Sequence, residues 1–330
     1  MLRHVMDTLD LLDDPSVTGA AAVAFLRERA GTPEGTPEGA PDAEISTTTV
    51  RGAKGSTDFI TVRVPGTDGR TRGGQAPTLG VIGRLGGIGA RPEQIDFVSD
   101  GDGAAAAIAL AAKLLDMARR GDRLPGDVVV GTHVCPDAPT RPHDPVPFMD
   151  SPVDMAAMND HEVLPEMEAI VSIDTTKGNR VINQRGIAIS NTVRQGYILP
   201  VSPDLVSVYE TVCGTYAQVF PLSTQDITPY ANGLYHINSI LQPAVAAAVP
   251  VVGVAVTAQT AVAGSATGAS HEVDIALAAR FALEVAKGFG AGRVAFHDEA
   301  EFDALVARYG PATHLQGLGT ESTESTGNTP

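Results

Sequence analysis

Apolar residues near the N-terminus recur at helical spacing in two short segments. Val, Met, Leu and Phe follow this spacing over residues 5–12 and 18–29, and Asp14-Pro15-Ser16 between them combines a helix stop with a new N-cap. The pattern predicts that residues 1–30 form two short helices.

The following part of the chain alternates apolar runs with a helical segment. Residues 59–64 alternate apolar and polar positions as a half-buried strand does, whereas residues 79–82 and 128–130 are continuous apolar runs of the kind found in fully buried strands. Between those two runs, residues 104–119 are rich in Ala and Leu and predict a helix that ends at Gly121. The order strand, helix, strand predicts an α/β fold with a mostly parallel sheet covered by helices.

Further elements of the same kind follow. Apolar runs predict buried strands over residues 169–173 and 251–256, and a closing helix is predicted over residues 274–289. Between residues 179 and 221 we expect elements of the same sheet layer, namely short extended segments at 187–189 and 196–199 and a helix near 205–214.

Two polar segments bound this pattern. Residues 31–44 repeat Gly-Thr-Pro-Glu, and residues 317–330 end in ESTESTGNTP without apolar periodicity. Such sequences bury too little apolar surface to order themselves, so we expect a flexible loop and a disordered tail. Residues 45–316 are then predicted to form a single α/β domain.

Composition and charge restrict the classes of molecule that this protein is expected to bind. The chain has 330 residues, a formal net charge of −16 and only two cysteines. Nucleic acid and anionic membrane surfaces are unfavourable partners for so acidic a protein, and two cysteines cannot build a disulfide framework. The N-terminal segment MLRHVMDTLDLLDD carries acidic residues where a signal peptide needs an apolar core, so we expect a cytoplasmic protein.

Candidate chemistry follows the ends of the apolar runs, because ligands of open α/β sheets collect beyond the carboxyl ends of the strands. Polar side chains stand there at Asp100, at His133 and Asp137, and from Asp174 to Lys177, with His271 just before the closing helix. Carboxylates and imidazoles that converge on one sheet edge can bind a divalent cation. Two of these residues have simpler explanations, because Asp100 can cap a helix and His133 can be a hydrogen-bonded core residue. Asp174 is less easily explained in this way, because a carboxylate that leaves a buried strand must be paired or coordinated.

A glycine-rich segment leaves a nucleotide site open as an alternative. Gly83, Gly87 and Gly89 follow a buried strand at the spacing of short-chain dehydrogenases. The turn of such an enzyme runs straight into a helix, whereas here Ala90-Arg91-Pro92 intervenes, and the chain contains no Tyr-x-x-x-Lys pair.

The order of these motifs resembles the glutamyl aminopeptidase branch of the zinc aminopeptidases, over about residues 10–290, and the whole chain resembles a bacterial and archaeal family of unknown function more closely still. The first strand of those aminopeptidases ends in Gly-His-Met-Asp-Glu-Val-Gly, which contains a zinc-binding His. Here Arg84 occupies the position of that His, Gly86 occupies that of the following Asp, and no Glu matches the family's Glu pair near residues 133–137.

Three other positions match the resembled family. Asp100 matches its metal-bridging Asp, Asp174 its Asp ligand at a strand end, and His271 its late His ligand. The resemblance therefore implies a three-layer α/β sandwich of the zinc-aminopeptidase (phosphorylase/hydrolase-like) type, with one zinc or manganese ion per chain on Asp100, Asp174 and His271. It also implies a metal-bound water that Asp137 or His133 deprotonates.

These features predict a metal-dependent hydrolase that acts on an amide, short peptide or amino-acid-derived small molecule, in a protein that forms homo-oligomers. The alternatives are a non-catalytic binding protein on the same scaffold and a nucleotide-binding oxidoreductase; a serine hydrolase is disfavoured because no Gly-x-Ser-x-Gly elbow occurs. The polar segment 224–242 is predicted to form a wall of the site. The predicted substrate-binding residues are Arg84, Thr175, Lys177, Gln225, Asp226 and Asn232.

Overall fold

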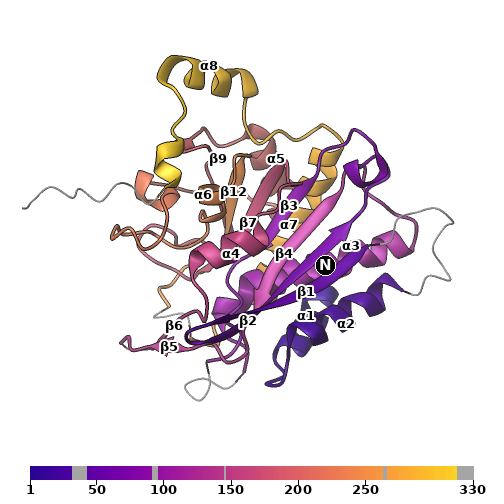
Figure 1. Ribbon diagram of the computed structural model, residues 1–330, viewed down its shortest axis with the longest axis vertical. Coiled ribbons are helices and arrows are strands. Elements are labelled where there is room, and N and C mark those ends of the chain that lie inside the picture. The colour runs from indigo at the N-terminus through magenta and orange to yellow at the C-terminus, as the bar shows by residue number, and fades with distance from the viewer. Residues whose placement is uncertain (32–42, 91–95, 145, 263–265, 318–330) are drawn as a thin grey trace, which may run out of the picture.

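The computed structural model describes residues 1–31, 43–90, 96–144, 146–262 and 266–317 (Figure 1). The strands are β1 (Glu44–Gly52), β2 (Gly55–Val64), β3 (Leu79–Gly83), β4 (Val128–Val134), β5 (Thr140–Arg141), β6 (Phe148–Met149), β7 (Ala169–Thr176), β8 (Gly186–Ser190), β9 (Val193–Arg194), β10 (Tyr197–Ile198), β11 (Val219–Phe220) and β12 (Val251–Thr257). The α-helices are α1 (Leu2–Leu12), α2 (Gly19–Ala30), α3 (Asp102–Arg119), α4 (Met155–Glu162), α5 (Pro203–Cys213), α6 (Pro243–Ala246), α7 (Glu272–Gly290) and α8 (Glu299–Tyr309). Short 3-10 helices are η2 (Arg70–Arg72), η3 (Ser99–Gly101), η4 (Thr224–Ile227) and η5 (Thr313–Gln316).

One large mixed sheet organises the described chain. Its strand order is β1-β2-β4-β3-β7-β12-β8-β11, and β9 and β10 extend it beside β12. The four central strands β4, β3, β7 and β12 run parallel to one another, whereas β1 and β2 pair antiparallel with their neighbours. β8 pairs antiparallel with β12 and parallel with β11. The predicted α/β architecture with parallel central strands is therefore confirmed, and the antiparallel strand β1 is an addition that the sequence pattern did not indicate.

Helices cover one face of the sheet as a continuous layer. The long helices α3 and α7 pack against each other and against the central strands, and α1, α2 and α5 lie around them (Figure 1). α3 is alanine-rich and almost wholly buried, because small side chains allow it to lie close to both the sheet and α7. The main hydrophobic core lies between this helical layer and the sheet.

The opposite face carries a second, smaller core. Strand residues alternate between the two faces, so Val128 and Val130 of β4 join the main core while Val129 joins the second one. Ile240 and Leu241, which precede α6, cover the second core together with residues 220–227. Both faces of the central strands are thus buried, which explains why these strands read as uninterrupted apolar runs.

The two predicted N-terminal helices correspond to α1 and α2. Residues 32–42 of the predicted flexible loop and residues 318–330 of the predicted disordered tail lie outside the described residues. Within the described ranges no helix combines the length and the apolar character that crossing a membrane requires.

Candidate functional site

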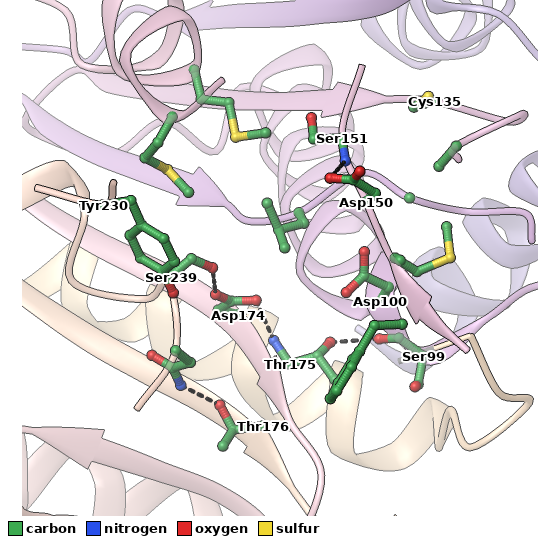
Figure 2. Close-up of a pocket in the computed structure, with 18 of the residues that line it drawn as sticks. Ser99, Asp100, Cys135, Asp150, Ser151, Asp174, Thr175, Thr176, Tyr230 and Ser239 are labelled. Atoms are coloured by element: carbon green, nitrogen blue, oxygen red, sulfur yellow. Dashed lines mark hydrogen bonds between the residues drawn. The ribbon is translucent and has the colours of Figure 1, made fainter. Parts of the chain in front are cut away.

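A pocket of about 620 Å³ opens where the central parallel strands end. His133 near the end of β4 contributes to its wall, together with Leu85, Gly87, Ser99 and Asp100 from the segment after β3. Asp174 and Thr175 contribute from the end of β7 (Figure 2). Residues within 148–158 and 230–239 complete the lining from two other segments. The pocket therefore occupies the sheet edge at which ligands of α/β proteins bind.

Asp174 is a buried carboxylate of this pocket with a raised pKa. Its side chain accepts a hydrogen bond from the Ser239 hydroxyl at Oδ2 and one from the Thr175 backbone N–H at Oδ1 (2.7 Å). Burial raises the pKa of Asp174 to about 6, although these hydrogen bonds and the nearby Arg84 favour the ionised form. A carboxyl group that titrates near neutral pH in a pocket can both accept and return a proton.

Asp100 shares the pocket with Asp174 and is held by a contact from the same strand end. The Thr175 hydroxyl donates to the backbone carbonyl of Ser99 (2.5 Å), which fixes η3, the turn that carries Asp100 (Figure 2). The carboxylate of Asp100 lies over Gly87, where an added Cβ would come within 2.7 Å of Oδ2. The pair Asp100 and Asp174 gives this pocket two buried carboxylates.

Lys177 adds a cation that is already paired. Its ammonium lies 2.8 Å from Asp102 Oδ2, and the Ser270 hydroxyl donates to Asp102 Oδ1 (2.5 Å). Burial raises the pKa of Asp102, and Lys177 opposes that rise. Lys177 therefore neutralises a buried carboxylate at the edge of the pocket.

Below the pocket, Arg84 and His133 belong to a buried network rather than to the open surface. The Nε atom of Arg84 lies 2.9 Å from Glu162 Oε2, and His133 Nδ1 lies 2.6 Å from Glu162 Oε1. The backbone N–H of Gly86 donates to His133 Nε2 (3.0 Å), so the ring proton is on Nδ1 and is donated to Glu162. Both nitrogens of the predicted catalytic histidine are thereby engaged.

The segment after β3 is glycine-rich because main chains approach closely there. An added Cβ on Gly83 would lie 2.3 Å from the carbonyl oxygen of Gly103, and one on Gly86 would lie 1.7 Å from that of His133. These approaches account for Gly83 and Gly86 through packing, and Gly83 is one of the three glycines whose spacing suggested a dinucleotide.

Residues 224–242, which we call the crossing segment, run over the end of β7 beside the pocket. The Asn238 side chain donates to the Thr176 hydroxyl (2.5 Å), next to the contact between Ser239 and Asp174 (Figure 2). Tyr230, from the same segment, stacks on His236 with ring centroids 4.6 Å apart. Burial, followed by the charge of Asp174, raises the pKa of the Tyr230 hydroxyl. Part of the predicted wall, namely residues 230–231 and 237–239, therefore lines the pocket.

The structure brings some predicted site residues together and separates others. Those that line the pocket are Asp100, His133, Asp174, Thr175 and Lys177. Those outside its lining are Arg84, Asp137, Gln225, Asp226, Asn232 and His271.

Most of the residues outside the lining have visible local roles. Asp226 accepts hydrogen bonds from Ser223 and from the backbone N–H of Ile237 (2.7 Å), and so anchors the crossing segment. Asn232 bonds to Thr228 within the same loop, and Gln225 is exposed in η4. The crossing segment is thus shaped by polar side chains that do not reach the pocket.

The two remaining residues are exposed. Asp137 lies in the loop after β4, and His271 is the N-cap residue of α7. Their side chains face solvent, in contrast to the buried Asp100 and Asp174.

The donors present do not fit the predicted metal ion. Within the described ranges, no group of three or more His, Cys, Asp or Glu side chains is placed to share one ion. His271 is outside the pocket lining, and the oxygens of Asp174 and nitrogens of His133 already have partners. The residues expected to act as one ligand set are therefore not assembled as such.

Residues 48–319 match a family described as "Protein of unknown function (DUF1177)". The chain belongs to this family. The match agrees with the expectation of a family of unknown function and carries no link to the zinc aminopeptidases. No curated protein is significantly similar to this DUF1177 chain. Its function must therefore be argued from the pocket itself.

Two polar residues that hold the site of this DUF1177 chain were not singled out from the sequence. Glu162, which lies outside the pocket lining, ends α4, a helix with no strand end beside it in the sequence. Ser239 lies within the segment 224–242 predicted as a wall and reaches Asp174 from 65 residues further along the chain. Both stand among other polar residues, so their polarity did not single them out. The methionines Met149, Met155 and Met158, which form an apolar part of the lining, were not singled out either.

Proposed function

We propose that the pocket is the active site of a hydrolase that acts on a small amide or amino-acid-derived molecule, with Asp174 as the acid–base group. The observation that carries this proposal is a buried carboxyl group with a pKa raised to about 6 that opens on a pocket at the sheet edge. Perturbed titration combined with a cleft is characteristic of functional carboxylates. The resemblance to zinc aminopeptidases supports the same class of substrate.

The charges of the lining favour a substrate with an amine. Four carboxylates line the pocket, namely Asp100, Asp150, Asp154 and Asp174, of which Asp150 is paired with Lys54. The lysine and arginine of the lining are Lys177, which is paired with Asp102, and Arg141. A protonated amine placed near Asp100 and Asp174 would complete this charge distribution. The methionine side chains on the other wall suit an apolar substrate side chain.

The proposed chemistry uses water as the nucleophile. Ionised Asp174 takes a proton from the attacking water, the water oxygen forms a bond to the amide carbon, and Asp174 returns the proton to the departing nitrogen. The products are a carboxylic acid and an amine. The metal dependence suggested by the resemblance is not part of this proposal, because the donors do not fit the ion.

The test is a substrate screen on matched variants. Wild type, Asp174→Asn and Asp226→Asn would be incubated with dipeptides and amino-acid amides, and released amine would be measured by mass spectrometry. Hydrolysis by wild type and Asp226→Asn that falls by at least about 100-fold in Asp174→Asn supports the role. Equal turnover in all three proteins would refute it.

Binding without turnover is the second candidate, and one observation favours it. Both oxygens of Asp174 and both nitrogens of His133 are engaged by the protein itself, which is the state of a rigid binding surface. Ligands of the same panel would then raise the melting temperature of the protein and remain chemically unchanged. Of the glycines that suggested the nucleotide-binding alternative, Gly83 is required by close main-chain packing, so part of that spacing has a structural explanation.

A further inference from the structure

A fully buried arginine lies at the centre of the network below the pocket. The Arg84 side chain has no exposed surface, and its Nε atom lies 2.9 Å from Glu162 Oε2. A second guanidinium nitrogen donates to Asn159 Oδ1 (2.5 Å), and a contact to Met155 Sδ completes its surroundings. An arginine is buried in this way only where its charge is matched, because an unpaired buried charge costs several kcal/mol.

Glu162 links Arg84 to the imidazole of His133. One of its oxygens faces Arg84 and the other accepts the Nδ1 proton of His133 (2.6 Å). The Gly86 N–H holds the opposite ring nitrogen (3.0 Å), so the imidazole is fixed in both orientation and tautomer. His133 then forms part of the pocket wall.

Arg84 also lies next to the acid–base group of the pocket. Its backbone N–H donates to the carbonyl of Ile173 (2.7 Å), the residue before Asp174. Its charge favours ionised Asp174, against the effect of burial. The guanidinium therefore pairs directly with Glu162, which in turn holds His133, and its charge also acts on Asp174.

We infer that Arg84 is a positioning residue that acts as a permanent, protein-borne cation at the centre of the site, so that the site is organised without a divalent ion. A guanidinium stays charged at every physiological pH and fixes its carboxylate partner in direction as well as charge. A divalent ion would have to compete with it for Glu162 and to displace the hydrogen bonds of His133. The inference rests on the proposed function only for the location of the site, and not on turnover.

The experiment uses the full chain and zinc or manganese alone as the probe. Bound metal would be measured by elemental mass spectrometry, and melting temperature would be recorded with added metal and with chelator, for wild type, Arg84→Gln and Arg84→Lys. Arg63→Gln is the matched control, because Arg63 makes only partly exposed ion pairs with Glu44 and Glu166.

We expect wild type, Arg84→Lys and Arg63→Gln to hold no stoichiometric ion and to melt at the same temperature in metal and in chelator. Arg84→Gln removes the positive charge that neutralises Glu162 and should gain a metal-dependent rise in melting temperature. That gain should be lost when Glu162→Gln is added to Arg84→Gln. A structural ion pair alone would not predict this gain.

Two results would overturn the inference. One is a wild-type protein with about one ion per chain that is lost in Glu162→Gln or Asp174→Asn. The other is a metal response of Arg84→Gln that equals the wild-type response. If Arg84→Gln fails to fold in both metal and chelator, the wild-type measurement decides: no stoichiometric ion supports the inference and one bound ion refutes it. Because no substrate is used, failure of the proposed hydrolysis leaves these outcomes unchanged.

Discussion

Replacement of Asp174 by Asn should stabilise the folded protein at neutral pH. Burial raises the pKa of Asp174 from 3.8 to about 6, so the folded state binds this proton more tightly than the unfolded state does. The ionised carboxylate therefore weakens folding above pH 6 and has no such effect below about pH 4. A pKa difference of about two units between the folded and unfolded states corresponds to about 3 kcal/mol of unfolding free energy.

The local hydrogen bonds permit this substitution. An Asn at position 174 keeps Oδ1 as the acceptor for the Thr175 N–H, and its amide nitrogen can donate to the Ser239 hydroxyl, which accepts as readily as it donates. The charge is thus removed with little loss of bonding. We expect a gain of up to about 3 kcal/mol at pH 7.5 that shrinks toward zero near pH 4.

Chemical denaturation of wild type and variant at pH 4, 5, 6 and 7.5 measures this difference. Asp226→Asn is the matched control, because Asp226 Oδ2 accepts from both the Ser223 N–H and its hydroxyl, and an amide nitrogen cannot accept from the N–H. The control should lose about 1–3 kcal/mol at neutral pH. If Asp174→Asn is equally or less stable than wild type at pH 7.5, burial is not the dominant influence on this carboxyl group.

Three further predictions concern other parts of the protein. Lys177→Met leaves the buried carboxylate of Asp102 without its cation and should cost about 3–5 kcal/mol in denaturant unfolding at neutral pH, with partial recovery when Asp102→Asn is added. Gly103→Ala places a Cβ 1.8 Å from the Arg84 carbonyl oxygen and should lower stability by at least about 1–3 kcal/mol. Gly131→Ala, whose Cβ would lie 3.5 Å from its nearest atom, should cost less stability. Thermal melts that show equal effects would contradict this packing argument. Light scattering at several protein concentrations should show a homo-oligomer, and a monomer mass throughout would refute that expectation.

The sequence predicted the central strands and helices because both faces of those strands are buried. Residues 79–82, 128–130, 169–173 and 251–256 are apolar without interruption, and this pattern leaves few other structures open. β1 was missed because it is an edge strand with mostly polar, exposed side chains. Such a segment lacks the apolar signal on which the reasoning depends.

The candidate site was predictable only where chemistry follows a strand end. Asp100, His133 and Asp174 were found in that way and do line the pocket. Glu162 and Ser239 were not found, because tertiary packing alone brings them to the strand ends. His271 was chosen by the order of motifs alone, and the structure places it, exposed, at the N-terminus of α7 and outside the pocket lining.

The pairing of β3 with β7 has a consequence for how the protein folds. Leu79 pairs with Ala169, so this contact joins segments about 90 residues apart and closes one of the costlier loops of the central sheet. Arg84 follows one of these strands and Asp174 lies near the end of the other, and Thr175 ties the second strand to the turn of Asp100. The pocket would therefore bind ligand only after β3 has paired with β7. The recovery of ligand binding during refolding would then measure how fast this long-range pairing forms.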